Sequence, residues 1–144
     1  MAPRLRWIDH LSPAYALSVA LRRDILRKPL GLEFTEAQLA SESNSYHLTA
    51  WEEDVLLGTL LLTPLESGSI QMRQVAVDDR RQGLGIGRLM VAESEAEAIG
   101  RGFTRMILHA RDTAVGFYLK LGYKPVGDEF IEVGVKHQEM VKQL

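Results

Sequence analysis

The chain has 144 residues, a formal net charge of −2 and 46% hydrophobic residues, which suits one globular domain with a substantial core. The slightly acidic balance argues against nucleic acid as a partner, and the lack of a long apolar run argues against a signal peptide or a membrane span. With no cysteine, a disulfide, a thiolate metal site and a cysteine nucleophile are excluded, and we expect a cytoplasmic protein without a bound metal.

The first part of the chain predicts a strand, a helix and a hairpin. A short strand is expected at residues 6–10, and Ser12 is placed to cap a helix that begins at Pro13. The inward face of this helix is predicted by three apolar residues at helical spacing: Leu17, Leu21 and Ile25. The elements expected next are a shorter helix and the two strands of an antiparallel hairpin, at residues 35–40, 46–51 and 55–62.

The following segment, SIQMRQVAV at residues 69–77, carries an irregularity in its hydrophobic alternation. Apolar residues alternate up to Met72 and resume at Val75, so the period of two slips by one residue at Arg73–Gln74. A β-bulge there would absorb the extra residue and keep the apolar side chains on one face. The alternative is one exposed apolar residue without a bulge. We predict the bulge.

The second part of the chain predicts two helices and three further strands. The first helix has its expected apolar face at Ile86, Leu89, Met90, Ala96 and Ile99. A largely apolar strand at 106–110 is expected to be buried in the sheet. A second helix follows Asp112 and ends at Gly122, a left-handed C-cap, with its expected face at Ala114, Phe117, Tyr118 and Leu121. The last strands start near Tyr123 and cover 137–143, which completes a mixed sheet with helices on both faces.

Glycine occupies every second position of the segment QGLGIG at residues 82–87, between a predicted strand and a predicted helix. A helix N-terminus offers unpaired N–H groups to a phosphate, and glycine lets the backbone approach the anion closely. The arginines at 80, 81 and 88 add positive charge, so we interpret the run as a pyrophosphate cradle. A glycine-rich turn without a ligand is the alternative. Neither a P-loop nor the dinucleotide fingerprint fits the spacing.

Two segments of the chain resemble signatures of the GNAT N-acetyltransferases. VAVDDRRQGLGIGRLM is similar to their acetyl-coenzyme A motif, Arg/Gln-x-x-Gly-x-Gly/Ala, matched by Gln82, Gly85 and Gly87. AVGFYLKLGY at 114–123 resembles the family's A-x-x-F-Y-x-x-x-G-F segment, although Arg111 stands where the family often has asparagine. The resemblance implies a single GNAT-like acetyltransferase domain over residues 1–144. Its fold would be α/β (α+β), with a mixed, mostly antiparallel twisted sheet whose bulged fourth strand is splayed from the fifth.

The resemblance also implies acetyl-CoA as the cosubstrate. Its pantetheine arm would pair with the backbone of the bulged strand, in the gap between the splayed strands, and its pyrophosphate would bind the amides of the glycine run. The residues implied in this binding are Val75, Ala76, Val77, Gln82, Gly83, Leu84, Gly85, Ile86, Gly87 and Arg88.

Candidates for proton transfer are few. Tyr118 stands where the family's general acid usually stands, and the alternative is an aromatic core residue. Glu132 and His137 are candidate bases, against the plainer interpretation of a solvated carboxylate and a hydrogen-bonded loop histidine. We expect His109 to be structural. Arg22 and Arg23 could line an acceptor cleft, but we expect them to be solvated.

The function that this implies is an N-acetyltransferase that moves an acetyl group directly from acetyl-CoA to a primary amine of a small molecule or protein. A coenzyme A-binding sensor or partner module without turnover is the alternative, and a ligand-free glycine-turn domain is a third. The expected partner is an amine-bearing acceptor, with no nucleic acid and no membrane, and the sequence is compatible with a homodimer.

Overall fold

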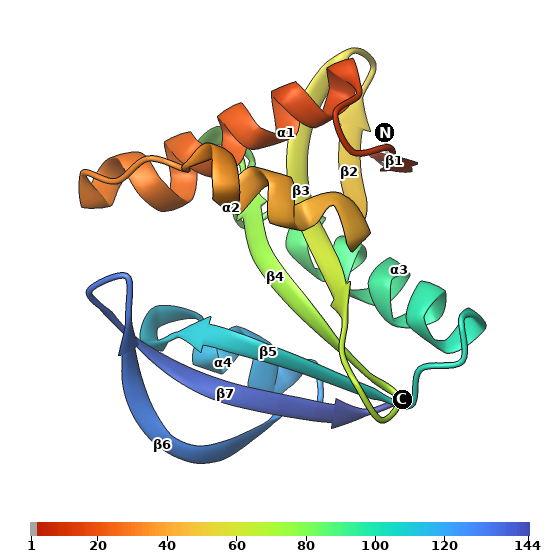
Figure 1. Ribbon diagram of the computed structural model, residues 1–144, viewed down its shortest axis with the longest axis vertical. Coiled ribbons are helices and arrows are strands. Elements are labelled where there is room, and N and C mark those ends of the chain that lie inside the picture. The colour runs from red at the N-terminus through yellow and green to blue at the C-terminus, as the bar shows by residue number, and fades with distance from the viewer. Residues whose placement is uncertain (1–2) are drawn as a thin grey trace.

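The computed structural model describes residues 3–144, and within them seven strands form one sheet in the order β1-β2-β3-β4-β5-β7-β6 (Figure 1). Neighbouring strands are antiparallel except for β4 and β5, which are parallel. The predicted mixed, mostly antiparallel sheet is therefore confirmed. The strands are β1 (Arg4–Ile8), β2 (Tyr46–Glu52), β3 (Val55–Pro64), β4 (Ser69–Val77), β5 (Arg105–Arg111), β6 (Lys124–Glu132) and β7 (Val135–Gln143).

Helices cover both faces of this sheet, as predicted. In Figure 1 α1 and α2 lie in front of it, and α3 and α4 lie behind it. Among residues 3–144, no helix has the length and apolar character needed to cross a bilayer. The helices are α1 (Pro13–Arg22), which runs on into a π-helical turn (Arg23–Arg27), α2 (Glu36–Ala40), α3 (Ile86–Gly100) and α4 (Val115–Lys120).

The buried face of α1 differs from the predicted one. Leu17 is 52% exposed, and the buried residues of the helix are Tyr15, Ser18 and Arg22. The apolar spacing is a poor guide here because α1 packs over β3 and β4 through polar side chains. The predicted cap is confirmed, since the Ser12 side chain accepts a hydrogen bond from the Tyr15 backbone N–H at 3.2 Å.

The buried face of α3 is also only partly as predicted. Ile86 and Met90 are buried, whereas Leu89, Ala96 and Ile99 face outward. The inner side of the helix is completed by Val91, Ser94 and Ala98. Residues four apart share a helix face, and the small side chains at the last two of these positions let the helix pack closely on the sheet.

A buried ion pair explains the polar face of α1. The Arg22 guanidinium donates to both carboxylate oxygens of Glu42, at 2.9 and 2.8 Å, and the Tyr15 hydroxyl donates to the same carboxylate at 2.7 Å. Arg22 and Glu42 are each 1% exposed. The expectation that Arg22 is solvated is therefore wrong: the fold supplies a carboxylate from a segment twenty residues away, which makes burial of the charge tolerable.

The bulge in β4 is confirmed at the predicted place. Leu61 of β3 pairs with Arg73, but Thr59 pairs with Ala76, so β4 holds one extra residue between these pairs. Gln74 takes a left-handed conformation with φ +55°, which side chains adopt at a cost. Its side-chain oxygen accepts a hydrogen bond from Arg22 Nη1 at 3.0 Å. The buried ion pair thus also holds the bulge.

The splay that the family resemblance implied is present as well. β4 and β5 pair only from Ser69 with Arg105 to Met72 with Leu108. Beyond Met72 the bulge intervenes, and the two strands diverge across the middle of the sheet (Figure 1). The backbone of β4 beyond this point has no strand beside it on the β5 side among the described residues.

Glu42→Ala is expected to destabilise the fold by about 3–5 kcal/mol, because it leaves Arg22 buried without its counter-ion. Urea unfolding followed by circular dichroism measures the change, with the exposed Glu33→Ala as the matched control. The double variant Arg22→Met/Glu42→Leu should recover most of the loss. A loss in Glu42→Ala no larger than in the control would contradict this assignment.

The same pair predicts a dependence on pH. Burial raises the pKa of Glu42, but the hydrogen bonds and charge of Arg22 outweigh this and hold the pKa below its ordinary value. A depressed carboxyl pKa stabilises the fold above the ordinary value, and this stabilisation is lost as the pH falls through the lower folded pKa. The stability difference between the wild type and Glu42→Gln should therefore shrink from about pH 7 to about pH 3.

Candidate functional site

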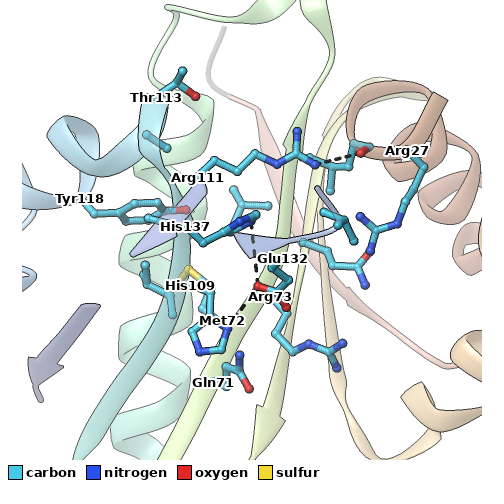
Figure 2. A pocket seen from close by; sticks show the side chains of 17 residues that line it. Arg27, Gln71, Met72, Arg73, His109, Arg111, Thr113, Tyr118, Glu132 and His137 are labelled. Atoms are coloured by element: carbon cyan, nitrogen blue, oxygen red, sulfur yellow. Dashed lines mark hydrogen bonds and ion pairs between the residues drawn. The ribbon is translucent and has the colours of Figure 1, made fainter. Parts of the chain in front are cut away.

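A cavity of about 200 Å³ opens where β4 and β5 part (Figure 2). Its walls come from the π-helical turn after α1, the bulged part of β4, the end of β5, α4, and the turn between β6 and β7. Segments that are far apart in sequence therefore converge on it. Of the predicted site residues, Val75, Tyr118, Glu132 and His137 line this cavity.

Tyr118 is the one residue of α4 that is buried, with 6% of its surface exposed. Its ring packs edge-on against Phe117 and Tyr123, with centroids 5.0 and 5.7 Å away. The hydroxyl points into the cavity (Figure 2), which Tyr118 lines. Burial raises the pKa of this hydroxyl, so it stays neutral and keeps a proton to donate. Phe117, expected on the same inward face, is 38% exposed.

Glu132 and His137 flank the turn that joins β6 to β7. This two-residue turn has φ +48° at Val133 and φ +76° at Gly134, as in the tight turns that fit the twist of a hairpin. His137 lies in β7 rather than in a loop. Its Nδ1 is 2.8 Å from the carbonyl of Val135, so this nitrogen donates, and Nε2 faces Glu132 Oε2 at 4.0 Å.

His109, which we expect to be structural, also lines the cavity. Its ring lies between two carboxylates, with Nδ1 3.4 Å from Glu132 and Nε2 3.2 Å from Glu139. The prediction of a buried strand at 106–110 is only partly correct, because buried and partly exposed residues alternate along it. Buried Met106, Leu108 and Ala110 leave the intervening side chains on the cavity side. This period of two was the signal that could have identified His109.

Three arginines that the sequence did not mark as site residues also line the cavity: Arg27, Arg73 and Arg111. Arg111 Nη2 donates to the Leu26 carbonyl at 2.8 Å, so its side chain reaches from β5 to the turn after α1. Burial lowers the pKa of Arg111, and burial together with the charge of Arg111 lowers the pKa of Arg27. Of these three arginines, only Arg111 stood out in the sequence, because the family that the sequence resembles often has asparagine at this position.

The glycine run forms a turn that leads into α3. Gly83 and Gly85 have φ of +83° and +82°, and no described atom lies within 4 Å of a Cβ built on either. Gly85 is the N-cap, and no side chain of the described residues caps the helix. The first backbone N–H groups of α3 therefore point into open space with their partial positive charge. A phosphate-sized anion fits this end of the helix.

The arginines beside the glycine run contribute less charge than expected. Arg80 pairs with Asp78 at 3.2 Å, and Arg81 pairs with Glu52 at 3.2 Å. Arg88 is exposed and has no acidic partner within 4.0 Å in the described chain. Their carboxylate partners largely neutralise the first two arginines, so the helix end and Arg88 remain as the positive features.

The predicted site residues thus form two groups, one at the cavity and one at the glycine turn. Phe117 lies between these two groups. A Cβ on Gly87 would lie 3.5 Å from the Phe117 ring, which itself packs against Tyr118. The Gln82 side chain donates to the Val77 carbonyl at 3.1 Å, an interaction that the sequence did not indicate. Ala76 and Ile86 are buried, and Leu84 is exposed.

Comparison with known proteins places this geometry in a family. A family model described as acetyltransferase (GNAT) domain matches residues 28–144. The uncharacterized N-acetyltransferase YjcF of Bacillus subtilis is 24% identical over 123 residues, which cover 85% of this chain and 87% of that protein. A provisionally named N-acetyltransferase from Lactobacillus plantarum is 26% identical, with a TM-score of 0.87 over 100% of this chain and 99% of its own.

A crystal structure of a GNAT family acetyltransferase from Elizabethkingia anophelis, with acetyl-CoA bound, has the same fold. The TM-score is 0.77 at 13% identity, and the match covers 99% of each chain. The family model begins at Lys28, directly after the π-helical turn, and extends to the last residue, so it includes both the splayed strands and the glycine turn. This chain belongs to the GNAT family of acetyltransferases.

Proposed function

We propose that this chain, as a single domain, transfers an acetyl group from acetyl-CoA directly to a primary amine. The observation that carries the proposal is the separation of β4 from β5 beside Tyr118, a buried side chain whose hydroxyl stays neutral because burial raises its pKa. A thioester in that gap would meet a proton donor on one side and Glu132 with His137 on the other. The acetyl-CoA complex of the Elizabethkingia relative supports the choice of cosubstrate.

The glycine turn fits the pyrophosphate of acetyl-CoA. The N-terminus of α3 lacks a side-chain cap in the described chain, and the space above Gly83 and Gly85 is open, so a phosphate can accept hydrogen bonds from the free amides between Gln82 and Arg88. The pantetheine arm would then run along Val75 to Val77 of β4 and pair with the backbone that β5 leaves unpaired. Phe117 lies between the turn and the cavity and supplies an apolar contact on this path.

The chemistry follows from three requirements of acetyl transfer. A primary amine is mostly protonated at neutral pH, so Glu132 or His137, directly or through water, removes a proton before attack. The amine nitrogen forms a bond to the thioester carbonyl carbon, and a backbone N–H near Val75 stabilises the oxyanion. The carbon–sulfur bond then breaks, and the sulfur takes a proton from the Tyr118 hydroxyl. The nitrogen loses its second proton, which returns to Tyr118 directly or through water, so the products are the amide and free coenzyme A thiol and the tyrosine is neutral again. With no cysteine in the chain, direct transfer is the simplest route.

Acetyl-CoA is expected to stabilise the fold. At about one hundred times its dissociation constant, the ligand should raise the free energy of unfolding by about 2.7 kcal/mol. Thermal unfolding with acetyl-CoA, NAD and ATP measures this, and the two nucleotides should have much smaller effects. Equal stabilisation by NAD would favour a dinucleotide site instead.

Gly85→Val is expected to abolish acetyl-CoA binding, because a β-branched side chain resists positive φ and fills the space in which the phosphate would lie. Gly102→Val is the matched control, since Gly102 follows the other end of α3 with φ +91° and open space around its Cβ. Both variants should lose about 1–3 kcal/mol of stability, but Gly102→Val should bind normally in calorimetry. Normal binding by folded Gly85→Val would remove the glycine turn from the site.

Tyr118→Phe is expected to lower kcat by about 100-fold or more, while acetyl-CoA affinity changes little. The variant keeps the ring and its packing against Phe117 and Tyr123 and removes only the hydroxyl. Release of free coenzyme A thiol measures kcat on an acceptor for which chemistry limits the rate.

The core interpretation of Tyr118 makes a different prediction. If Tyr118 only packs in the core, loss of its hydroxyl leaves kcat at the wild-type value. Wild-type kcat in the folded variant would end the catalytic role of Tyr118. Acetyl-CoA binding without thiol release on any amine would favour a coenzyme A-binding module without turnover.

A further inference from the structure

Positive charge is concentrated on one side of the cavity. Arg27 comes from the turn after α1, Arg73 from the bulged part of β4, and Arg111 from the end of β5. All three are partly buried, and none has a carboxylate within 4.0 Å in the described part of the chain. By contrast, the fully buried Arg22 is paired with Glu42. A partly buried cation without a counter-ion costs stability, so the cluster needs a reason.

The three guanidinium groups act on a shared space. Burial, the charge of Arg111 and the charge of Arg22 lower the pKa of Arg27, and Arg73 adds in the same direction. Glu132 opposes this effect but forms no ion pair with Arg27. The hydrogen bonds of the cluster go to neutral acceptors: Arg111 donates to the Leu26 carbonyl at 2.8 Å, and Arg73 donates to the Thr63 hydroxyl at 3.5 Å. Several donors therefore stay free for an anion.

The turn between β6 and β7 contributes groups of complementary character to the same cavity. Glu132 lies there with His109 and His137 around its carboxylate (Figure 2). A protonated amine is attracted to this side, and an acid is attracted to the arginines. The cavity, at about 200 Å³, is smaller than the roughly 300–1,000 Å³ that drug-sized ligands occupy, so the part of the acceptor that enters it is small.

We propose that the acetyl acceptor is a small amino acid-type molecule, whose acidic group binds Arg27, Arg73 and Arg111 and whose amine faces Glu132. This inference rests on the proposed N-acetyltransfer and adds the class of acceptor. The arginines bind the acid through charge-assisted hydrogen bonds. With the acid bound by the arginines, the amine is left to face Glu132 and to react with the thioester.

The test uses the protein amino acids, each paired with its carboxamide, together with 2-aminoethylphosphonate. A carboxamide keeps the amine and the side chain and removes only the negative charge. Its amine is less basic, which on its own favours the amide at neutral pH, so a preference for the acid is a stringent result. We expect kcat/KM for at least one free amino acid, measured by thiol release, to exceed that of its amide by about 10- to 100-fold.

Arg27→Gln and Arg73→Gln test the cluster, with Arg23→Gln as the matched control. Arg23 lies four residues before Arg27, is exposed, and pairs with Asp24 outside the cavity. Each cavity variant should raise KM for the acid by about 10- to 100-fold and leave KM for the amide nearly unchanged. Calorimetry with the same amino acid and amide, without acetyl-CoA, provides a readout that does not depend on turnover.

The results of these experiments distinguish a failure of the acidic-acceptor proposal from a failure of the proposed N-acetyltransfer. Thiol release with neutral amines or amides at least as fast as with amino acids would overturn the acidic acceptor and leave N-acetyltransfer intact. Faster reaction with peptides than with free amino acids would also overturn it. No thiol release with any amine, together with amino acid binding lost in Arg73→Gln, would overturn the transfer reaction but support the anion site. A preference for 2-aminoethylphosphonate would support the anion site and identify a phosphonate-type group as the acid.

Discussion

The hydrogen bond from Arg22 to Gln74 joins the helical layer to the point at which β4 leaves regular pairing. Arg22 can be buried there because Glu42 binds it with both oxygens, and the position of the guanidinium in turn fixes the side chain of a residue with a left-handed backbone. The bulge ends the pairing of β4 with β5 after Met72, and the cavity lies where the pairing ends. A buried ion pair is often no better for stability than apolar packing, but here it sets the geometry of the gap.

The chemistry of the gap depends on burial as much as on position. Tyr118 stays neutral because its hydroxyl is desolvated, and the rigid ring packing around it aims that hydroxyl into the cavity. Glu132, in contrast, is exposed and lies close to two histidine rings. Our proposal that Tyr118 gives a proton and Glu132 takes one rests on this difference in burial.

Several of the places where this chain departs from regular patterns lie at the candidate site. Gln74 and Val133 have positive φ, Gly85 begins a helix without a side-chain cap in the described chain, and the cavity arginines lack carboxylate partners there. Each departure costs stability locally, and the regular core between α3 and the sheet offsets these costs. Natural sequences tolerate such conflicts mainly where function requires them.

Local sequence patterns were sufficient to predict the order of the elements, the Ser12 cap, the slip at Arg73–Gln74 and the glycine turn. The family resemblance added Tyr118 as a candidate site residue. These features depend on residues within a few positions of one another, through caps, periodicity and turn chemistry. The pairing of Arg22 with Glu42, the inward face of α1, the exposure of His109 to the cavity and the meeting of three arginines could not be predicted in this way. Each depends on which strands become neighbours, because charges separated by tens of residues meet only once the sheet has brought their elements together.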